Sequence, residues 1–192
     1  MTASVVPMSP DIDEPHVVAV ARDRAHHFSK PTCDEIVLVE GWGVEGDAHA
    51  GKTAQHISHI RRDASAPNLR QVHLIHAELF DLAAHRGHTV APGELGENIT
   101  TVGIDLLGLP RGAHVHLGEE AVVEITGLRN PCSQINGLSA GLMKEFVYVD
   151  AAGETVRLTG VMSIVVHGGV VRPGDGIRVT LPEGVPERLQ PV

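Results

Sequence analysis

Glycine and proline interrupt this sequence so often that long regular elements have little room to form. The chain has 21 glycines and 12 prolines in 192 residues, and they recur with acidic residues at short intervals. Between these turns, the second half of the chain carries short runs rich in aliphatic and β-branched residues, at 95–104, 112–118, 121–128, 155–169 and 176–182. The pattern predicts an α+β domain that is mainly β, with an antiparallel sheet closed as a barrel and a few short helices.

The first half of the chain predicts three further strands, at 16–23, 35–41 and 69–76. Residues 41–68 show no sustained period and predict a long loop, of the kind that often carries function. A helix is expected next, at 77–87, because Leu79, Leu82 and Ala83 share one face and Gly87 suits its end.

The expected organisation is one domain with two flanking segments. A short helix that runs into a strand is predicted at 139–150. We expect a flexible lead-in at 1–15, the domain at 16–182 and a C-terminal tail at 183–192.

Net charge and hydropathy argue against several classes of partner. The formal net charge is −9, and no cluster of Lys or Arg stands out, so a general nucleic-acid binder is not expected. No apolar stretch approaches the roughly 20 residues that span a bilayer, and the N-terminus does not resemble a signal peptide. We therefore expect a soluble, cytoplasmic protein without a membrane partner. Nothing in the sequence indicates its oligomeric state.

The two cysteines, Cys33 and Cys132, are expected to be free thiols, since disulfides are rare in the cytoplasm. Two are too few for a four-cysteine zinc site or an iron–sulfur cluster. Cys33 lies in a loop-like stretch and is interpreted as a spectator, with a resolving role toward Cys132 as the alternative. Cys132, in GLRNPCSQINGL, follows a strand-like run and stands among residues that offer charge and hydrogen bonds.

Six blocks of the sequence, in order, resemble the MOSC domain, the C-terminal domain of molybdenum-cofactor sulfurases, which also occurs as a small stand-alone protein. They span most of residues 16–181 and are GVEGDAHAG (43–51), LRQVHLIH (69–76), PGELGENIT (92–100), GIDLLGLPRGAHVHLG (103–118), ITGLRNPCSQI (125–135) and GVVRPGDGIRV (169–179). The resemblance implies a β-rich barrel and a molybdenum–pterin cofactor.

The resemblance also implies that Cys132 either ligates molybdenum or carries sulfur as a persulfide. A thiolate suits both roles, because molybdenum takes soft ligands and sulfur relay needs a nucleophile. Arg129 offers a positive charge and a helix beginning after Cys132 would add its dipole, and both favour the thiolate. Pro131 would stiffen the backbone that carries Cys132 and hold Asn130 in an extended conformation.

Further cofactor-binding candidates come from the other blocks. Asp47 and His49 stand on a glycine-rich loop that could close over a ligand, although Asp47 alone could simply cap a turn. Glu97 and Asn98 are placed at the pocket wall by the resemblance, and Glu97 could equally pin the end of a strand. Arg70 would suit a cofactor phosphate if its strand points it into the pocket, and a surface arginine is the alternative.

The sequence leaves several mechanisms open. Cys132 could accept sulfur from a separate cysteine desulfurase, because the chain has no room for a pyridoxal-phosphate domain. It could instead serve a reductase of N-hydroxylated small molecules that receives electrons from a partner protein. The alternatives are a metal-free nucleophile activated by His49 and oriented by Asn98 or Asp47, or a non-catalytic cofactor-binding module. The 13 histidines show no recognised metal-site spacing, so a separate histidine metal site is not expected.

Overall fold

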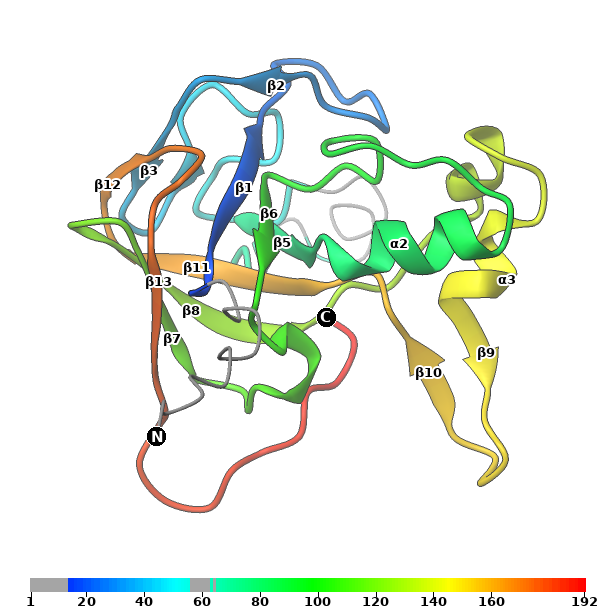
Figure 1. The fold of residues 1–192 in the computed structure, drawn as a ribbon. Coiled ribbons are helices and arrows are strands. Elements are labelled where there is room, and N and C mark those ends of the chain that lie inside the picture. The colour runs from blue at the N-terminus through cyan, green and yellow to red at the C-terminus, as the bar shows by residue number, and fades with distance from the viewer. Residues whose placement is uncertain (1–13, 56–62, 64) are drawn as a thin grey trace, which may run out of the picture.

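Short strands separated by turns make up most of the regular structure (Figure 1). The computed structural model describes residues 14–55, 63 and 65–192. Most of the expected lead-in, 1–15, and part of the expected loop, 41–68, therefore lie outside the described residues. The strands are β1 (His16–Ala21), β2 (Thr32–Cys33), β3 (Ile36–Val39), β4 (Gly43–Val44), β5 (Val72–His76), β6 (Ile99–Val102), β7 (His114–Leu117), β8 (Ala121–Leu128), β9 (Val147–Val149), β10 (Thr155–Arg157), β11 (Val161–His167), β12 (Gly169–Val171) and β13 (Ile177–Thr180).

The helices are short. They are α2 (Glu78–His85), α3 (Leu142–Phe146) and two 3₁₀ helices, η1 (Leu106–Gly108) and η2 (Ser133–Gly137). The helix predicted at 77–87 and the helix-then-strand predicted at 139–150 are both confirmed, as α2 and as α3 followed by β9. No helix among the described residues is long and apolar enough to cross a membrane.

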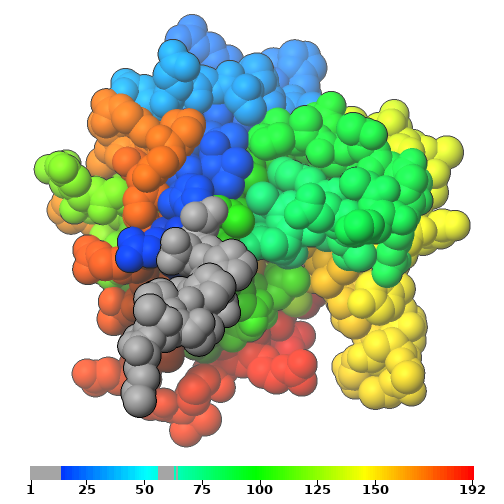
Figure 2. All heavy atoms as spheres, viewed as in Figure 1, coloured from blue at the N-terminus to red at the C-terminus, as the bar shows by residue number. Residues whose placement is uncertain are grey.

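One eight-stranded sheet organises the molecule, in the order β13, β7, β8, β11, β5, β6, β1, β2. Neighbours in this sheet are antiparallel except β5 and β6, which run parallel. A parallel pair needs a crossover connection, and α2 lies within it. A second sheet joins β12, β3 and β4, and β9 and β10 form a separate hairpin that stands away from the body of the protein (Figure 2).

The large sheet curls until two distant parts of the chain meet. Val17 N donates to Asp175 O at 2.9 Å and Ile177 N donates to Pro15 O at 2.8 Å, beside an isolated bridge between His16 and Gly176. The expectation of a mainly β fold is confirmed. The strand ladders among the described residues do not close into a barrel, and the start of β1 meets the start of β13 through these few backbone bonds instead.

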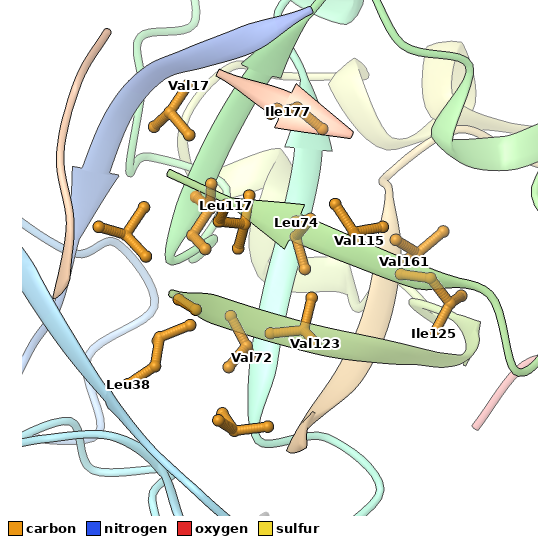
Figure 3. Close-up of a cluster of buried hydrophobic side chains, with 14 of the residues drawn as sticks. Val17, Leu38, Val72, Leu74, Val115, Leu117, Val123, Ile125, Val161 and Ile177 are labelled. Carbon is orange, nitrogen blue, oxygen red and sulfur yellow. The ribbon is translucent and has the colours of Figure 1, made fainter. Parts of the chain in front are cut away.

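The main core lies inside the curved sheet. Strand β7 shows how alternation builds it, because Val115 and Leu117 are fully buried while His114 and His116 point outward. Figure 3 shows aliphatic side chains from several strands meeting there, namely Val17, Leu38, Val72, Leu74, Val115, Leu117, Val123, Ile125, Val161 and Ile177.

A second apolar cluster fixes the segment that follows Cys132. Ile135 of η2 and Leu142 and Phe146 of α3 are fully buried against Leu79 of α2 and Ile75 of β5. Burial of such side chains stabilises by about 1.5–3 kcal/mol each. The loop that carries Cys132 is therefore anchored to the protein on its C-terminal side.

The strand predicted at 155–169 is wrong as a single element, because it divides into β10 and β11. Gly160 causes the break. Its φ is +80°, and a Cβ at this position would overlap the carbonyl oxygen of Leu74. Only glycine fits where the chain turns this closely against β5.

Candidate cofactor and substrate cavity

A cavity of about 790 Å³ opens where the polar ends of several elements meet. Its walls come from segments far apart in the sequence: 26–30, 49–55, 66–73, 96–98, 129–134, Met162 and 191–192. Of the described residues singled out from the sequence, those that line it are His49, Arg70, Asn98, Arg129, Asn130 and Cys132. The fold thus brings together residues from four of the sequence blocks.

The loop that follows β8 carries Cys132. Backbone bonds hold its start, since Arg129 N donates to Gly160 O at 3.0 Å. Cys132 is extended and half-buried, and its thiol lies 3.3 Å from the Gln134 side-chain oxygen, to which it donates. The helix expected after Cys132 is the five-residue 3₁₀ helix η2, so its dipole is weaker than that of a full α-helix.

Arg129 is a deeply buried charge on the cavity wall, with 8% of its surface exposed. Its Nη2 donates to Leu95 O at 3.4 Å and its guanidinium lies 5.9 Å from the Phe28 ring centre. Nη1 is buried and has no hydrogen-bond partner among the described residues. Burial lowers the pKa of Arg129 to about 10, and a negative charge on Cys132 opposes that shift. Arg129 is thus a buried positive charge on the cavity wall with one N–H that lacks an acceptor among the described residues.

Arg70 adds a second guanidinium to the lining of the same cavity, and it lies just before β5 rather than within a strand. Arg70 Nη1 donates to Val192 O at 2.9 Å. Burial lowers the pKa of Arg70, and the charge of Cys132 acts in the opposite direction. Arg70 and Arg129 therefore both interact electrostatically with the sulfur.

Asp47 does not line the cavity but lies behind its wall, 7% exposed. Its carboxylate accepts hydrogen bonds from Lys30 Nζ at 2.7 Å, from Asn98 Nδ2 at 3.0 Å and from His49 N at 2.9 Å. The His49 ring nitrogen Nδ1 lies 3.2 Å from Asp47 Oδ1. Burial raises the pKa of Asp47, but the bonds from His49 and the charge of Lys30 outweigh burial and hold the pKa well below its usual value. Asp47 is thus an ionised anchor for three cavity residues.

Glu97 is also placed behind the wall rather than in it, and is fully buried. Its Oε1 accepts from Gly93 N and, at 3.2 Å, from Thr100 Oγ1, while Oε2 has no partner among the described residues. Burial raises the pKa of this carboxyl, and the bond from Gly93 opposes the shift. These contacts join Glu97 to the turn at Gly93 and to the start of β6.

Sequence reasoning missed two buried titratable residues that line the cavity. Lys30 is the partner of Asp47, and its own pKa is lowered by burial against the opposing charge of Asp47. His73 bonds through Nε2 to Thr159 O at 2.8 Å, and since a carbonyl only accepts, Nε2 carries the proton. Burial, aided by the charge of Arg129, lowers the pKa of His73 well below its usual value, so the ring is neutral. In the sequence, an isolated lysine and a histidine within a strand have no pattern that would mark them as buried cavity residues.

The described residues contain no group of three or more His, Cys, Asp or Glu side chains that could hold a metal ion. His114 and His116 lie on the outer face of the sheet, where His114 Nε2 is 3.5 Å from Glu124 and His116 Nε2 is 3.0 Å from Thr180. Cys33 lies in β2, with its sulfur 3.3 Å from Glu35 O and away from the cavity lining.

Comparison with known proteins shows the family of this chain. A family model described as "MOSC domain" matches residues 23–178. The chain belongs to the MOSC domain family. This family is associated with the molybdenum cofactor, and the matched range contains all eight residues singled out as site candidates. Among curated proteins, none matches this MOSC chain.

Solved structures share the MOSC fold over most of the chain. YuaD from Bacillus subtilis is 22% identical with a TM-score of 0.71, over 88% of this chain and 97% of that chain. YiiM from Escherichia coli is 20% identical with a TM-score of 0.56, over 89% and 72%. YiiM from Geobacillus stearothermophilus is 16% identical with a TM-score of 0.58, over 86% and 75%. At these identities the likeness concerns the fold.

Proposed function

We propose that this MOSC protein binds the molybdenum cofactor in the cavity, that the Cys132 thiolate ligates molybdenum, and that the chain reduces an N-hydroxylated small molecule. One observation carries the proposal. The half-buried Cys132 thiol shares a cavity with Arg70 and Arg129, and Arg129 presents a buried N–H that has no partner among the described residues.

The donor atoms fit a metal that brings ligands of its own. A metal bound by protein alone needs three or four ligands, and no such group occurs among the described residues. The cavity offers one soft donor, the Cys132 sulfur, and a thiolate suits molybdenum. A pterin cofactor would bring sulfur ligands of its own, so Cys132 would be the residue of this chain that holds the molybdenum.

The two guanidiniums fit the phosphate of such a cofactor. A buried donor without an acceptor costs about 1–3 kcal/mol, which a phosphate oxygen at Arg129 Nη1 would recover. Arginine is the residue best suited to phosphate, because its planar N–H groups match two oxygens at once.

When bound, the cofactor supplies the two-electron redox chemistry, and the protein supplies protons and position. Cleavage of the N–O bond converts R–NH–OH, two electrons and two protons into R–NH₂ and water. His49 is held by Asp47, and a ring fixed in this way can hold and pass a proton at the cavity wall. The electrons would come from a separate donor protein, since this chain has two cysteines and cannot build an iron–sulfur cluster.

The test is the molybdenum content per chain after expression in cells that make the cofactor. The wild-type protein should carry close to one molybdenum per chain, and Cys132→Ala should lose most of it. Cys33→Ala is the matched control, because Cys33 is also partly exposed but lies outside the cavity lining, and it should keep the metal. Equal metal in all three proteins would overturn the assignment of Cys132.

The partial exposure of the Cys132 thiol favours a second candidate, a sulfur carrier loaded by a separate cysteine desulfurase. A donor protein must reach the sulfur for this exchange, and a buried thiol would prevent it. This candidate predicts no molybdenum in the wild type and a mass increase of one sulfur atom on Cys132 after incubation with a desulfurase and cysteine. Cys33 should gain none.

A further inference from the structure

The segment expected to be a tail is a fixed part of the fold. Leu128 N donates to Gln190 O at 2.9 Å and Val192 N donates to Leu128 O at 3.2 Å, with a parallel bridge between Leu128 and Pro191. Leu189 is buried in the main core. We call residues 187–192 the C-terminal wall, because its last two residues line the cavity.

Gly127 of β8 makes room for this wall. A Cβ at Gly127 would overlap Gln190 O and Val192 Cγ1, so any larger residue would push the wall away. Glycine within a strand often marks such a close approach of another backbone. The position of the wall is therefore built into the strand beneath it.

The wall gives one side of the cavity an apolar character. Pro191 and Val192 line it together with Met162 and Leu69, and Leu69 keeps 37% of its surface exposed. The polar side of the same cavity begins immediately beside them, because Arg70 Nη1 donates to Val192 O at 2.9 Å. A guanidinium and an apolar surface are thus fixed next to each other.

Two of the residues on this side of the cavity come from a part of the chain that the family match does not include. The matched residues end at 178, whereas Pro191 and Val192 lie beyond them.

We propose that Leu69, Pro191 and Val192 form an apolar subsite that binds the uncharged body of the substrate beside Arg70. The substrate class that fits is a small aryl or alkyl compound with a polar reactive end. The proposal rests on the proposed function in one respect, namely that this cavity is the ligand site. Burial of an aryl ring against these side chains adds affinity that a bare polar group cannot gain.

The test compares two probes that differ only by the apolar group, inorganic phosphate and phenyl phosphate, by calorimetry on the full chain purified without cofactor. The wild type should bind phenyl phosphate at least about fivefold more tightly than phosphate. The double variant Leu69→Asn, Val192→Thr keeps the approximate size of both side chains and replaces much of their apolar surface with polar groups. It should lose this preference while its phosphate affinity stays within about twofold.

The matched control is Val179→Thr, Leu181→Asn, which makes the same chemical changes at exposed positions outside the cavity lining and should keep the preference. Gly127→Ala should also lose the preference and show faster amide exchange at 187–192. A double variant that keeps the preference, or a wild type without any, would overturn the subsite. A chain that keeps the preference but carries no molybdenum would overturn the proposed function and leave the subsite standing.

Discussion

The Lys30 ammonium lies 2.7 Å from the Asp47 carboxylate, and both side chains are almost completely buried, Lys30 in the cavity wall and Asp47 behind it. This pair joins the loop that precedes β2 to the glycine-rich loop that carries His49. It also brings a third element, because Asn98 Nδ2 donates to the same carboxylate oxygen as Lys30. The Asp47 carboxylate and the side chains that donate hydrogen bonds to it therefore hold the back of the cavity together.

Lys30→Met should strongly destabilise the protein, because it leaves the Asp47 charge buried without its cation. Loss of one partner of a buried ion pair costs about 3–5 kcal/mol. Urea denaturation of the wild type and the variant at neutral pH measures the difference. The matched control is Arg172→Met, which breaks the pair between Arg172 and Glu35 at 2.6 Å on the exposed surface and should cost less than about 1 kcal/mol. Equal losses of unfolding free energy in the two variants would show that the buried pair contributes no more stability than the exposed pair.

The stability of the protein should fall on mild acidification because of His73. Its folded-state pKa lies below its unfolded value, so its contribution is fully present above about pH 6.5 and is lost as the pH falls below that. His73→Gln keeps a donor for Thr159 O and removes the titration. Between about pH 7.5 and about pH 5.5, the wild type should lose about 1 kcal/mol more unfolding free energy than the variant. Parallel pH profiles of the two proteins would contradict this assignment.

Gly160→Ala should cost far more than Gly153→Ala, although both glycines have nearly the same backbone. Their φ angles are +80° and +83°, so alanine is strained by about 1 kcal/mol at either position. A Cβ at Gly160 would also overlap Leu74 O, whereas Gly153 has open space around it. We expect an additional loss of about 2 kcal/mol for Gly160→Ala in thermal or urea denaturation. Similar values for both variants would rule out the steric contribution.

The local pattern of the sequence predicted most of the strands because their alternation is a local property. In β7, valine and leucine at every second position are enough to assign both the strand and its buried face. The division of 155–169 was missed because it depends on the distant carbonyl of Leu74, which no local pattern contains. The parallel pairing of β5 and β6 was missed for the same reason.

The candidate site was predictable where it consists of sequence blocks and unpredictable where it consists of contacts between them. Arg129 and Cys132 stand three residues apart, so their proximity could be inferred. The pairing of Lys30 with Asp47 and the approach of Val192 to Arg70 join segments far apart in the chain. Asp47 and Glu97 were expected to touch the cofactor, and their placement behind the wall follows from burial that only the folded chain reveals. Their direct contact with a cofactor stays a prediction.

The few backbone bonds between residues 15–17 and 174–177 also constrain when the protein can finish folding. Contacts between segments so distant in sequence form late, because the whole intervening chain must first be brought together. On a ribosome, the start of β1 emerges early and waits until nearly all of the chain has been made. During that interval an unpaired strand edge is exposed, and such edges promote aggregation. We therefore expect the nascent chain to need protection from aggregation that the finished protein no longer needs.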